Sequence, residues 1–279
     1  MRLFAALVAL VAVLATNGAS ARRVPAFAHA VVIVFENKDQ QSIIGSREAP
    51  TFTALARRYA QLTQYYGVTH PSLPNYIALV SGSAQGISDD CTDCIVSAPN
   101  LVDSLDAARK TWKLYAEGLP SRGFTGAFSG RYAKKHVPFL YFKDIVDNPA
   151  RLNRVVPLTE LTPDIRARKL PNFAFVVPDM CHSMHDCSIA AGDAWLKAIV
   201  PRLLKLKQTV VFVVFDEGTS NDRGGGHLPA LALGTAVRAH ARFTAVTNHY
   251  GLLRTIEDAW RLPRLGDSAK AGPIVGIWR

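Results

Sequence analysis

The sequence predicts an α/β protein with a single doubly wound, mostly parallel sheet and helices on both faces. Three apolar, β-rich runs carry this prediction: 28–37 (AHAVVIVFEN), 173–180 (FAFVVPDM) and 209–218 (TVVFVVFDEG). The last two lack the polar alternation of a strand with one side in water, so they are interpreted as central parallel strands. Helical patterns alternate with the runs, and such alternation is typical of doubly wound sheets.

The other elements are expected in the following order along the chain. A helix is expected over 49–66, where apolar residues recur at helical spacing, and a shorter one over 75–81, ended by a glycine. A long helix is expected at 188–206 and a strand at 228–234 (LPALALG). The last expected helix covers 247–261.

The first residues predict an exported protein. A basic start is followed by an apolar run over 3–15 and by small residues at 19–21. The run is short for a membrane span, so residues 1–21 are interpreted as a cleaved signal peptide, with an uncleaved anchor as the alternative. Residues 22–279 are then expected to form one periplasmic or extracellular domain without stable membrane insertion.

Charge and cysteine usage narrow the classes of partner. The formal net charge of +10 favours an anionic partner. The basic residues are dispersed, so a small phosphorylated substrate is expected and a specific nucleic-acid partner is not. In an exported chain, the local pairs Cys91/Cys94 and Cys181/Cys187 favour disulfides over the alternative, a cysteine-ligated zinc site.

Side chains that can ligate metals follow each strong strand. Glu36 and Asn37 follow the first, Asp179 the second, and Asp216 and Glu217 the third. Because functional groups gather past the carboxyl ends of parallel strands, these side chains are expected at one edge of the sheet. Carboxylates gathered in a cleft repel one another and must be neutralised by protons or a metal. The alternative for each acid is a helix cap.

Histidines lie near these acids in the sequence. His182 and His185 come shortly after Asp179, and His227 follows the glycine run RGGGH. Mixed carboxylate and imidazole ligands suit zinc, manganese or iron. His240, in RAHARF, is expected to be an exposed loop residue.

Ser72 lies between Pro71 and Pro74, which restrict the backbone just before the helix over 75–81. A helix N-terminus offers unpaired amide groups and a positive dipole end, which favour an alkoxide and a bound phosphate. Asn75 is expected to direct its amide at the same anion. A G-x-S-x-G motif is absent from the sequence, so this setting favours metal-activated phosphoryl transfer over a serine triad. A simple capping serine is the alternative.

Several stretches together resemble one family. They are VIVFENKD, YYGVTHPSLPNYIALVSG, YAKKHVPFLYF, VPDMCHSMHDCSIAAGDAWL, VVFDEG, GGHLPALALG and NHYGLLRTIEDAWRLPRLG. In this order they resemble the phosphoesterase family of the alkaline-phosphatase superfamily, which includes bacterial acid phosphatases and phospholipase C-like enzymes. The resemblance implies an alkaline-phosphatase-like fold and a metal-dependent phosphoester hydrolase with a phosphoseryl intermediate.

The resemblance also implies roles for individual residues. Ser72 matches the nucleophile, Asn75 the asparagine that holds a phosphate oxygen, and His136 a group that binds phosphate or protonates the leaving oxygen. His185, also a candidate catalytic residue, lies with Asp179 and His182 where two-metal relatives place ligands of the second metal. The full set of candidate metal ligands is Glu36, Asn37, Asp179, His182, Asp216, Glu217 and His227.

Two departures from the two-metal relatives leave the cofactor open. The stretch DEG stands where those relatives carry an Asp-His pair, and Glu-Asn replaces their first aspartate. One or two divalent ions are therefore expected, without distinction among Zn, Mn, Fe and Ca. The expected activity is that of an acid phosphatase on monoesters. The alternatives are a phosphodiesterase or phospholipase C-like enzyme, a serine esterase, a sulfatase, or a non-catalytic anion-binding protein.

Overall fold

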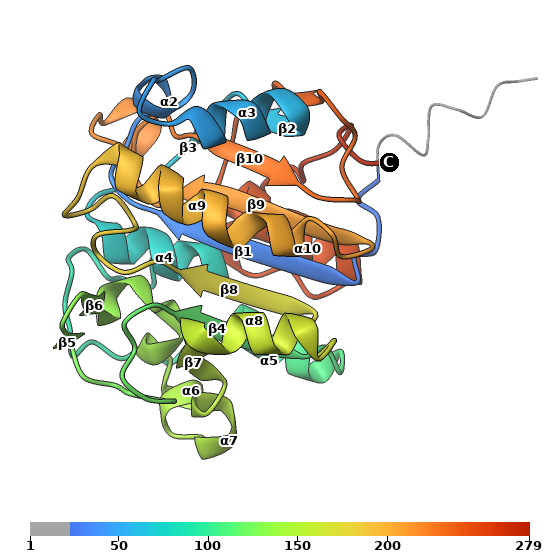
Figure 1. The fold of residues 1–279 in the computed structure, drawn as a ribbon. Helices are drawn as coiled ribbons and strands as arrows, with labels where there is room; N and C mark the ends of the chain where they lie inside the picture. Colours follow the sequence, from blue (N-terminus) through green and yellow to red (C-terminus); the bar gives the residue numbers. More distant parts are fainter. Residues whose placement is uncertain (1–22) are drawn as a thin grey trace, which may run out of the picture.

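An eight-stranded sheet organises residues 23–279, the part of the chain that this computed structural model describes (Figure 1). The predicted signal peptide at 1–21 lies outside the described residues. The strand order is β11-β2-β10-β9-β1-β8-β4-β7. In chain order the strands are β1 (His29–Phe35), β2 (Ala60–Leu62), β4 (Trp112–Ala116), β7 (Val155–Pro157), β8 (Phe173–Val177), β9 (Thr209–Phe215), β10 (Ala230–Leu233) and β11 (Arg242–Phe243).

The central strands are parallel and buried on both faces. Strand β1 pairs in parallel with β8 on one side and with β9 on the other. Every residue of β8 and β9 is buried, because successive side chains point to opposite faces of the sheet and helices cover both faces. Strand β10 runs antiparallel to both of its neighbours, β9 and β2. The other neighbouring strands are parallel, so the sheet is mostly parallel. The predicted sheet is confirmed.

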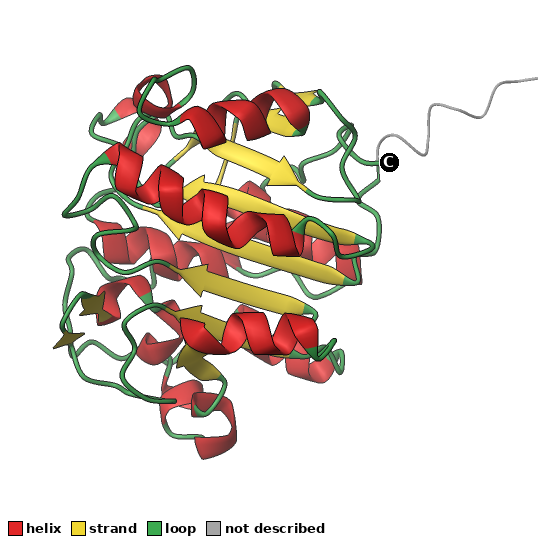
Figure 2. Ribbon diagram, viewed as in Figure 1, coloured by secondary structure: helices red, strands yellow, loops and turns green. Residues whose placement is uncertain are grey.

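Helices cover both faces of this sheet (Figures 1 and 2). One face carries α3 (Pro50–Arg58), α8 (Leu161–Arg166) and α9 (Ile189–Leu203). The other carries α4 (Ser72–Ser81), α5 (Leu101–Ala107) and α10 (His249–Trp260). The shorter elements are α2 (Gln40–Ile43), β3 (Tyr65–Tyr66), β5 (Phe128–Ser129), β6 (Tyr132–Ala133), α6 (Lys143–Val146), α7 (Pro149–Leu152) and β12 (Thr247–Asn248).

The helix expected over 49–66 is wrong in its second half. Helix α3 ends at Arg58, and residues 60–62 form strand β2 instead. Gln61 pairs with Leu231 of β10 on one side and with Arg242 of β11 on the other. Hydrogen bonds from two neighbouring strands therefore override a local helical pattern, an effect that sequence spacing alone does not reveal.

Both cysteine pairs form disulfides, so the predicted bridges Cys91–Cys94 and Cys181–Cys187 are confirmed. The structure favours disulfides over the alternative of a cysteine-ligated zinc site, because the chain contains four cysteines and all four are bridged. Within residues 23–279, no helix combines the length and the apolar character that a membrane crossing requires.

Candidate active site

Three carboxylates meet where β1 and β9 end. Glu36 follows β1, and Asp216 and Glu217 follow β9, the parallel neighbour of β1. All three side chains are buried. Asn37 supports the group, because its backbone N–H donates to Asp216 Oδ1 at 3.2 Å and its side-chain amide donates to Glu36 Oε2 at 3.5 Å. We call Glu36, Asp216 and Glu217 the carboxylate cluster.

Ser72 directs its hydroxyl at this cluster. It is the first residue of α4 and is 1% exposed. Its Oγ donates toward Glu36 Oε2 at 3.1 Å and Glu217 Oε1 at 3.3 Å. The Ser72 hydroxyl donates to these acids and accepts from no backbone amide of α4, so it does not perform the capping role that was the alternative.

The donor chemistry of the carboxylate cluster suits a divalent cation. Burial, and for Glu36 and Glu217 also repulsion from Asp216, raises the pKa of each member, that of Glu217 to about 7. Asp216 Oδ2 is buried without a hydrogen-bond partner. Such an atom is costly unless an ion or proton satisfies it. The three carboxylates and the serine hydroxyl form an oxygen donor set suited to a hard or borderline cation.

One of the predicted histidines, His136, lies beside the cluster, and a second, His185, lies next to His136. His136 is 1% exposed, and its Nε2 lies 3.3 Å from Glu36 Oε1. Burial, with the charge of Lys135, lowers the pKa of His136 well below its ordinary value, which favours the neutral ring. The His185 ring centroid lies 5.9 Å from that of His136, and His185 Nδ1 lies 2.7 Å from Asp186 Oδ1.

Sequence reasoning missed three residues that hold the carboxylate cluster. His70 Nδ1 lies 2.5 Å from Glu217 Oε2, and the Tyr76 hydroxyl donates to Glu36 Oε1. His249 Nε2 donates to the Asp216 carbonyl oxygen at 2.6 Å. Tyr76 was detectable, since it lies one helical turn after Ser72 and therefore on the same face of α4. His249 lies far away in the sequence and gives no local signal.

Asn75 does not have the predicted orientation. Its Oδ1 accepts from the backbone N–H groups of Val68 and Thr69 at 2.8 and 3.1 Å. Its amide donates to the carbonyl oxygens of Thr69 and Pro71 at 2.7 and 3.2 Å. Asn75 therefore holds the loop that precedes Ser72, and a contact with a phosphate oxygen would require these bonds to break.

Asp179 and His182 lie in a second group rather than in the carboxylate cluster. His182 Nδ1 lies 3.0 Å from Glu117 Oε2, at the end of β4. Asp179 Oδ1 accepts from the backbone N–H groups of Cys181 and His182 at 2.9 and 2.8 Å, so it caps its own turn. A ligand atom from each of Glu117, Asp179 and His182 lies within 4.8 Å of the others. A second metal bound by Asp179 and His182 stays a prediction.

His227 also lies apart from the carboxylate cluster. Its Nε2 donates to the Thr63 carbonyl oxygen at 2.9 Å, and its ring stacks on Tyr66 with centroids 4.9 Å apart. An isolated bridge between Tyr66 and His227 positions the ring there, because it pairs the two backbones. These contacts do not support the predicted ligand role of His227.

The family comparison decides the class of this site. The model of the Phosphoesterase family matches residues 46–263. The chain belongs to this family. The predicted hydrolase acting on phosphoric ester bonds is therefore confirmed.

Two proteins with related amino-acid sequences are named as phosphatases. A phosphatidylinositol-3-phosphatase of Mycobacterium tuberculosis is 36% identical over 267 residues, which cover 94% of this chain and 86% of the relative. A probable acid phosphatase of Kluyveromyces lactis is 31% identical over 261 residues, which cover 86% of this chain and 60% of the relative. The phosphoesterase thus spans less than two thirds of the yeast protein.

Solved structures confirm the alkaline-phosphatase-like fold of this phosphoesterase. A Vibrio parahaemolyticus protein of the alkaline phosphatase superfamily superposes with a TM-score of 0.59 at 14% identity, covering 86% of this chain and 68% of that one. Murine ectonucleotide pyrophosphatase/phosphodiesterase 5 gives a TM-score of 0.56 at 12% identity, covering 85% and 96%. At these identities the likeness extends to the fold alone.

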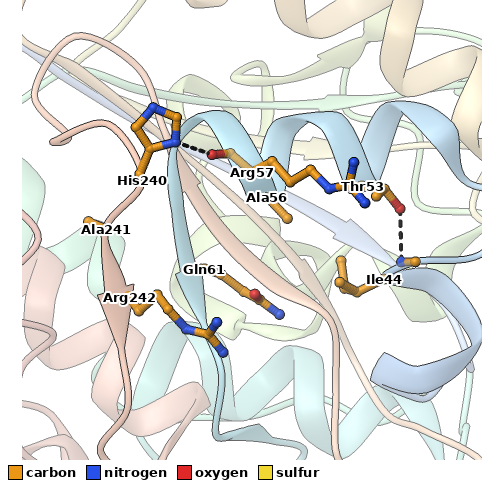
Figure 3. Close-up of a pocket in the computed structure, with 9 residues that line it drawn as sticks. Ile44, Thr53, Ala56, Arg57, Gln61, His240, Ala241 and Arg242 are labelled. Atoms are coloured by element: carbon orange, nitrogen blue, oxygen red, sulfur yellow. Dashed lines mark hydrogen bonds between the residues drawn. The ribbon is translucent and has the colours of Figure 1, made fainter.

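A cavity of about 310 Å³ lies elsewhere on this phosphoesterase, between α3, β2 and β11 (Figure 3). His240 is exposed there, as predicted, and its Nδ1 donates to the Arg57 carbonyl oxygen at 2.6 Å. None of the predicted site residues lines this cavity. The cavity is therefore separate from the carboxylate cluster, none of whose three residues lines it.

Stability should depend on pH and metal together. The folded, metal-free phosphoesterase holds protons on the carboxylate cluster more tightly than the unfolded chain does, because burial raises these pKa values. The cluster's contribution to the free energy of unfolding should therefore be largest below about pH 4 and fall as the pH rises to about 7. A cation competes with those protons, so its stabilising effect should grow over the same range.

Urea unfolding with EDTA or with added divalent metal, at about pH 5 and about pH 8, tests this expectation. The gap in unfolding free energy between the metal-loaded and metal-free protein should be larger at the higher pH. An equal or smaller gap at the higher pH would contradict it.

Proposed function

We propose that this phosphoesterase is an exported, metal-dependent acid phosphatase that hydrolyses phosphate monoesters through a phosphoseryl intermediate. One observation carries the proposal: the Ser72 hydroxyl lies at a helix N-terminus, 3.1 and 3.3 Å from carboxylates of a buried cluster. The relatives named as phosphatases support monoester hydrolysis.

A divalent cation would be held by the carboxylates of Glu36, Asp216 and Glu217, with Asn37 beside them. When bound, such an ion supplies a Lewis acid that lowers the pKa of the Ser72 hydroxyl and offsets the charge of the cluster. The unpartnered Asp216 Oδ2 supports this assignment. Zinc, manganese, iron and calcium all remain candidates.

Ser72 Oγ attacks phosphorus in the first step, so a serine ester forms and the bond to the leaving oxygen breaks. The serine proton passes to Glu217, whose Oε1 lies 3.3 Å away. The leaving oxygen takes a proton from His185, which Asp186 orients through Nδ1. Neutral His136 donates a hydrogen bond to a phosphate oxygen.

Water attacks the phosphoserine in the second step. It gives one proton to His185 as its oxygen bonds to phosphorus, and Ser72 departs with the proton held by Glu217. Inorganic phosphate is released, and Glu217 and His185 return to their starting protonation states. The same residues therefore serve both half-reactions in opposite directions.

Export is part of the proposal. The two disulfides support an oxidising compartment, since such bridges persist in exported proteins. The cleaved signal peptide at 1–21 and the single domain over 22–279 stay predictions.

Hydrolysis of p-nitrophenyl phosphate and of its bis ester, by the metal-stripped protein refilled with single metals, tests the proposed function. Monoester turnover should appear only with metal and exceed diester turnover. Turnover of the diester alone would favour the phosphodiesterase alternative, and turnover that survives EDTA would favour a serine esterase. An absence of turnover with every metal would favour an anion-binding protein.

A further inference from the structure

We propose that Lys135 is a substrate-binding residue that gives this site its preference for phosphate monoesters over diesters. The inference rests on the proposed function and names the group that recognises the second negative charge of a monoester.

Lys135 lies next to His136 in the chain and contacts His185. It belongs to the 3₁₀ turn Lys134–His136, which places it next to His136, and its side chain is 13% exposed. Its Nζ lies 3.3 Å from His185 Nε2. The neighbouring His136 lies with its Nε2 3.3 Å from Glu36 Oε1, so the turn that carries Lys135 contacts the cluster. Lys135, His136 and His185 therefore form one group, and His136 joins that group to Glu36 of the carboxylate cluster.

The charge balance of the site calls for a cation at this place. With the three carboxylates ionised, one bound divalent ion would leave one net negative charge on the cluster. A phosphate monoester dianion brings two further negative charges at neutral pH, whereas a diester brings only one. A partly buried lysine beside the cluster offsets the additional charge through charge-assisted hydrogen bonds. The benefit is larger for the monoester, which sets the direction of the preference.

Asp90 holds Lys135 in position and shares its charge. Asp90 Oδ2 lies 2.8 Å from Lys135 Nζ, and Asp90 Oδ1 accepts from the backbone N–H of Leu73 at 2.9 Å. Leu73 directly follows Ser72, so one carboxylate joins the lysine to the first turn of α4. The Leu73 amide is thereby occupied and is not free to bind an anion, as was expected of the helix N-terminus. Lys135 contributes positive charge at this place instead.

Lys134 provides a matched control. It precedes Lys135 in the same turn, but its Nζ donates to the Thr92 carbonyl oxygen at 2.8 Å and lies 4.7 Å from the centroid of the Tyr141 ring. Lys134 therefore binds the loop that contains Asp90, but its ammonium group contacts Thr92 and Tyr141 and does not belong to the proposed anion site.

The test compares Lys135→Met, Lys135→Arg, Asp90→Asn and Lys134→Met in the metal-loaded protein. Titration with inorganic phosphate gives Kd, and kcat/KM is measured for p-nitrophenyl phosphate and its bis ester. Lys135→Met should weaken phosphate binding at least about tenfold and lower monoester kcat/KM by a similar factor, with a much smaller loss for the diester. Lys135→Arg should restore part of both, and Lys134→Met should leave the monoester-to-diester ratio unchanged.

Asp90→Asn separates charge from tethering. It breaks the ion pair but keeps an oxygen for the Leu73 amide, so phosphate should bind as tightly as in the wild type or more tightly. Equal weakening by Asp90→Asn and Lys135→Met would overturn the proposal, because Lys135 would then only tether the loop. Equal losses for both esters would overturn it too. If the wild type hydrolyses neither ester, the proposed function fails, while the phosphate titration still decides the role of Lys135.

Discussion

Ser72→Ala should lower kcat for p-nitrophenyl phosphate at least about a thousandfold, which corresponds to roughly 4 kcal/mol of barrier at 1.36 kcal/mol per tenfold. The reason is that the variant lacks the oxygen that the proposed mechanism joins to phosphorus, while the remaining groups of the proposed site still bind phosphate. The fold should survive, because the Ser72 hydroxyl contacts two acids and caps no backbone amide. Steady-state kinetics with saturating metal measures the effect.

Ser81→Ala is the matched control for that substitution. Ser81 lies at the other end of α4, is 2% exposed, and donates through Oγ to the Ile77 and Ser83 carbonyl oxygens. Its loss should cost about 1 kcal/mol of stability and leave kcat within a small factor of the wild type. If Ser72→Ala behaved like Ser81→Ala, Ser72 would have a structural role and the phosphoseryl mechanism would be excluded.

Asp216→Asn should abolish metal-dependent stabilisation and lower kcat at least about a hundredfold. It should also make the metal-free protein more stable, because the substitution removes one of three mutually repelling buried charges. Urea unfolding with and without metal measures both effects. A substitution that stabilises the metal-free protein while abolishing activity is the behaviour expected of a metal ligand.

Asp193→Asn is the control for this second prediction. Asp193 is also a buried acid, at 5% exposure, but its Oδ1 accepts from the backbone N–H groups of Thr51 and Phe52 at 2.9 and 3.0 Å. Asp193→Asn should therefore reduce stability with and without metal alike, and the metal response should persist. A metal-free Asp216→Asn protein that is less stable than the wild type, or that still responds to metal, would contradict the assignment.

Local sequence patterns predicted the site residues that follow directly after strands. Glu36, Asp216 and Glu217 could be placed together because parallel neighbours end at one edge of a sheet, and β1 and β9 are such neighbours. Ser72 could be singled out from its two flanking prolines. Strand β2, which replaces part of the helix predicted over 49–66, could not be predicted, since its partners β10 and β11 lie more than a hundred residues away in the sequence.

Side-chain orientation set the limit of the sequence reasoning. Asn75 has the position expected of a phosphate ligand, yet four hydrogen bonds turn its amide to the loop before Ser72. Asp179 follows β8 as predicted, but its carboxylate caps the turn that follows. The pairing of Lys135 with Asp90 joins residues 45 positions apart, and no local pattern signals it.

Acid quenching of the metal-loaded protein during turnover of p-nitrophenyl phosphate, followed by peptide mass spectrometry, tests the central claim most directly. The account predicts one phosphoryl group on the peptide that contains Ser72, localised to that serine, and none in Ser72→Ala. Turnover with an unmodified Ser72, or a phosphoryl group on another residue, would contradict the phosphoseryl mechanism.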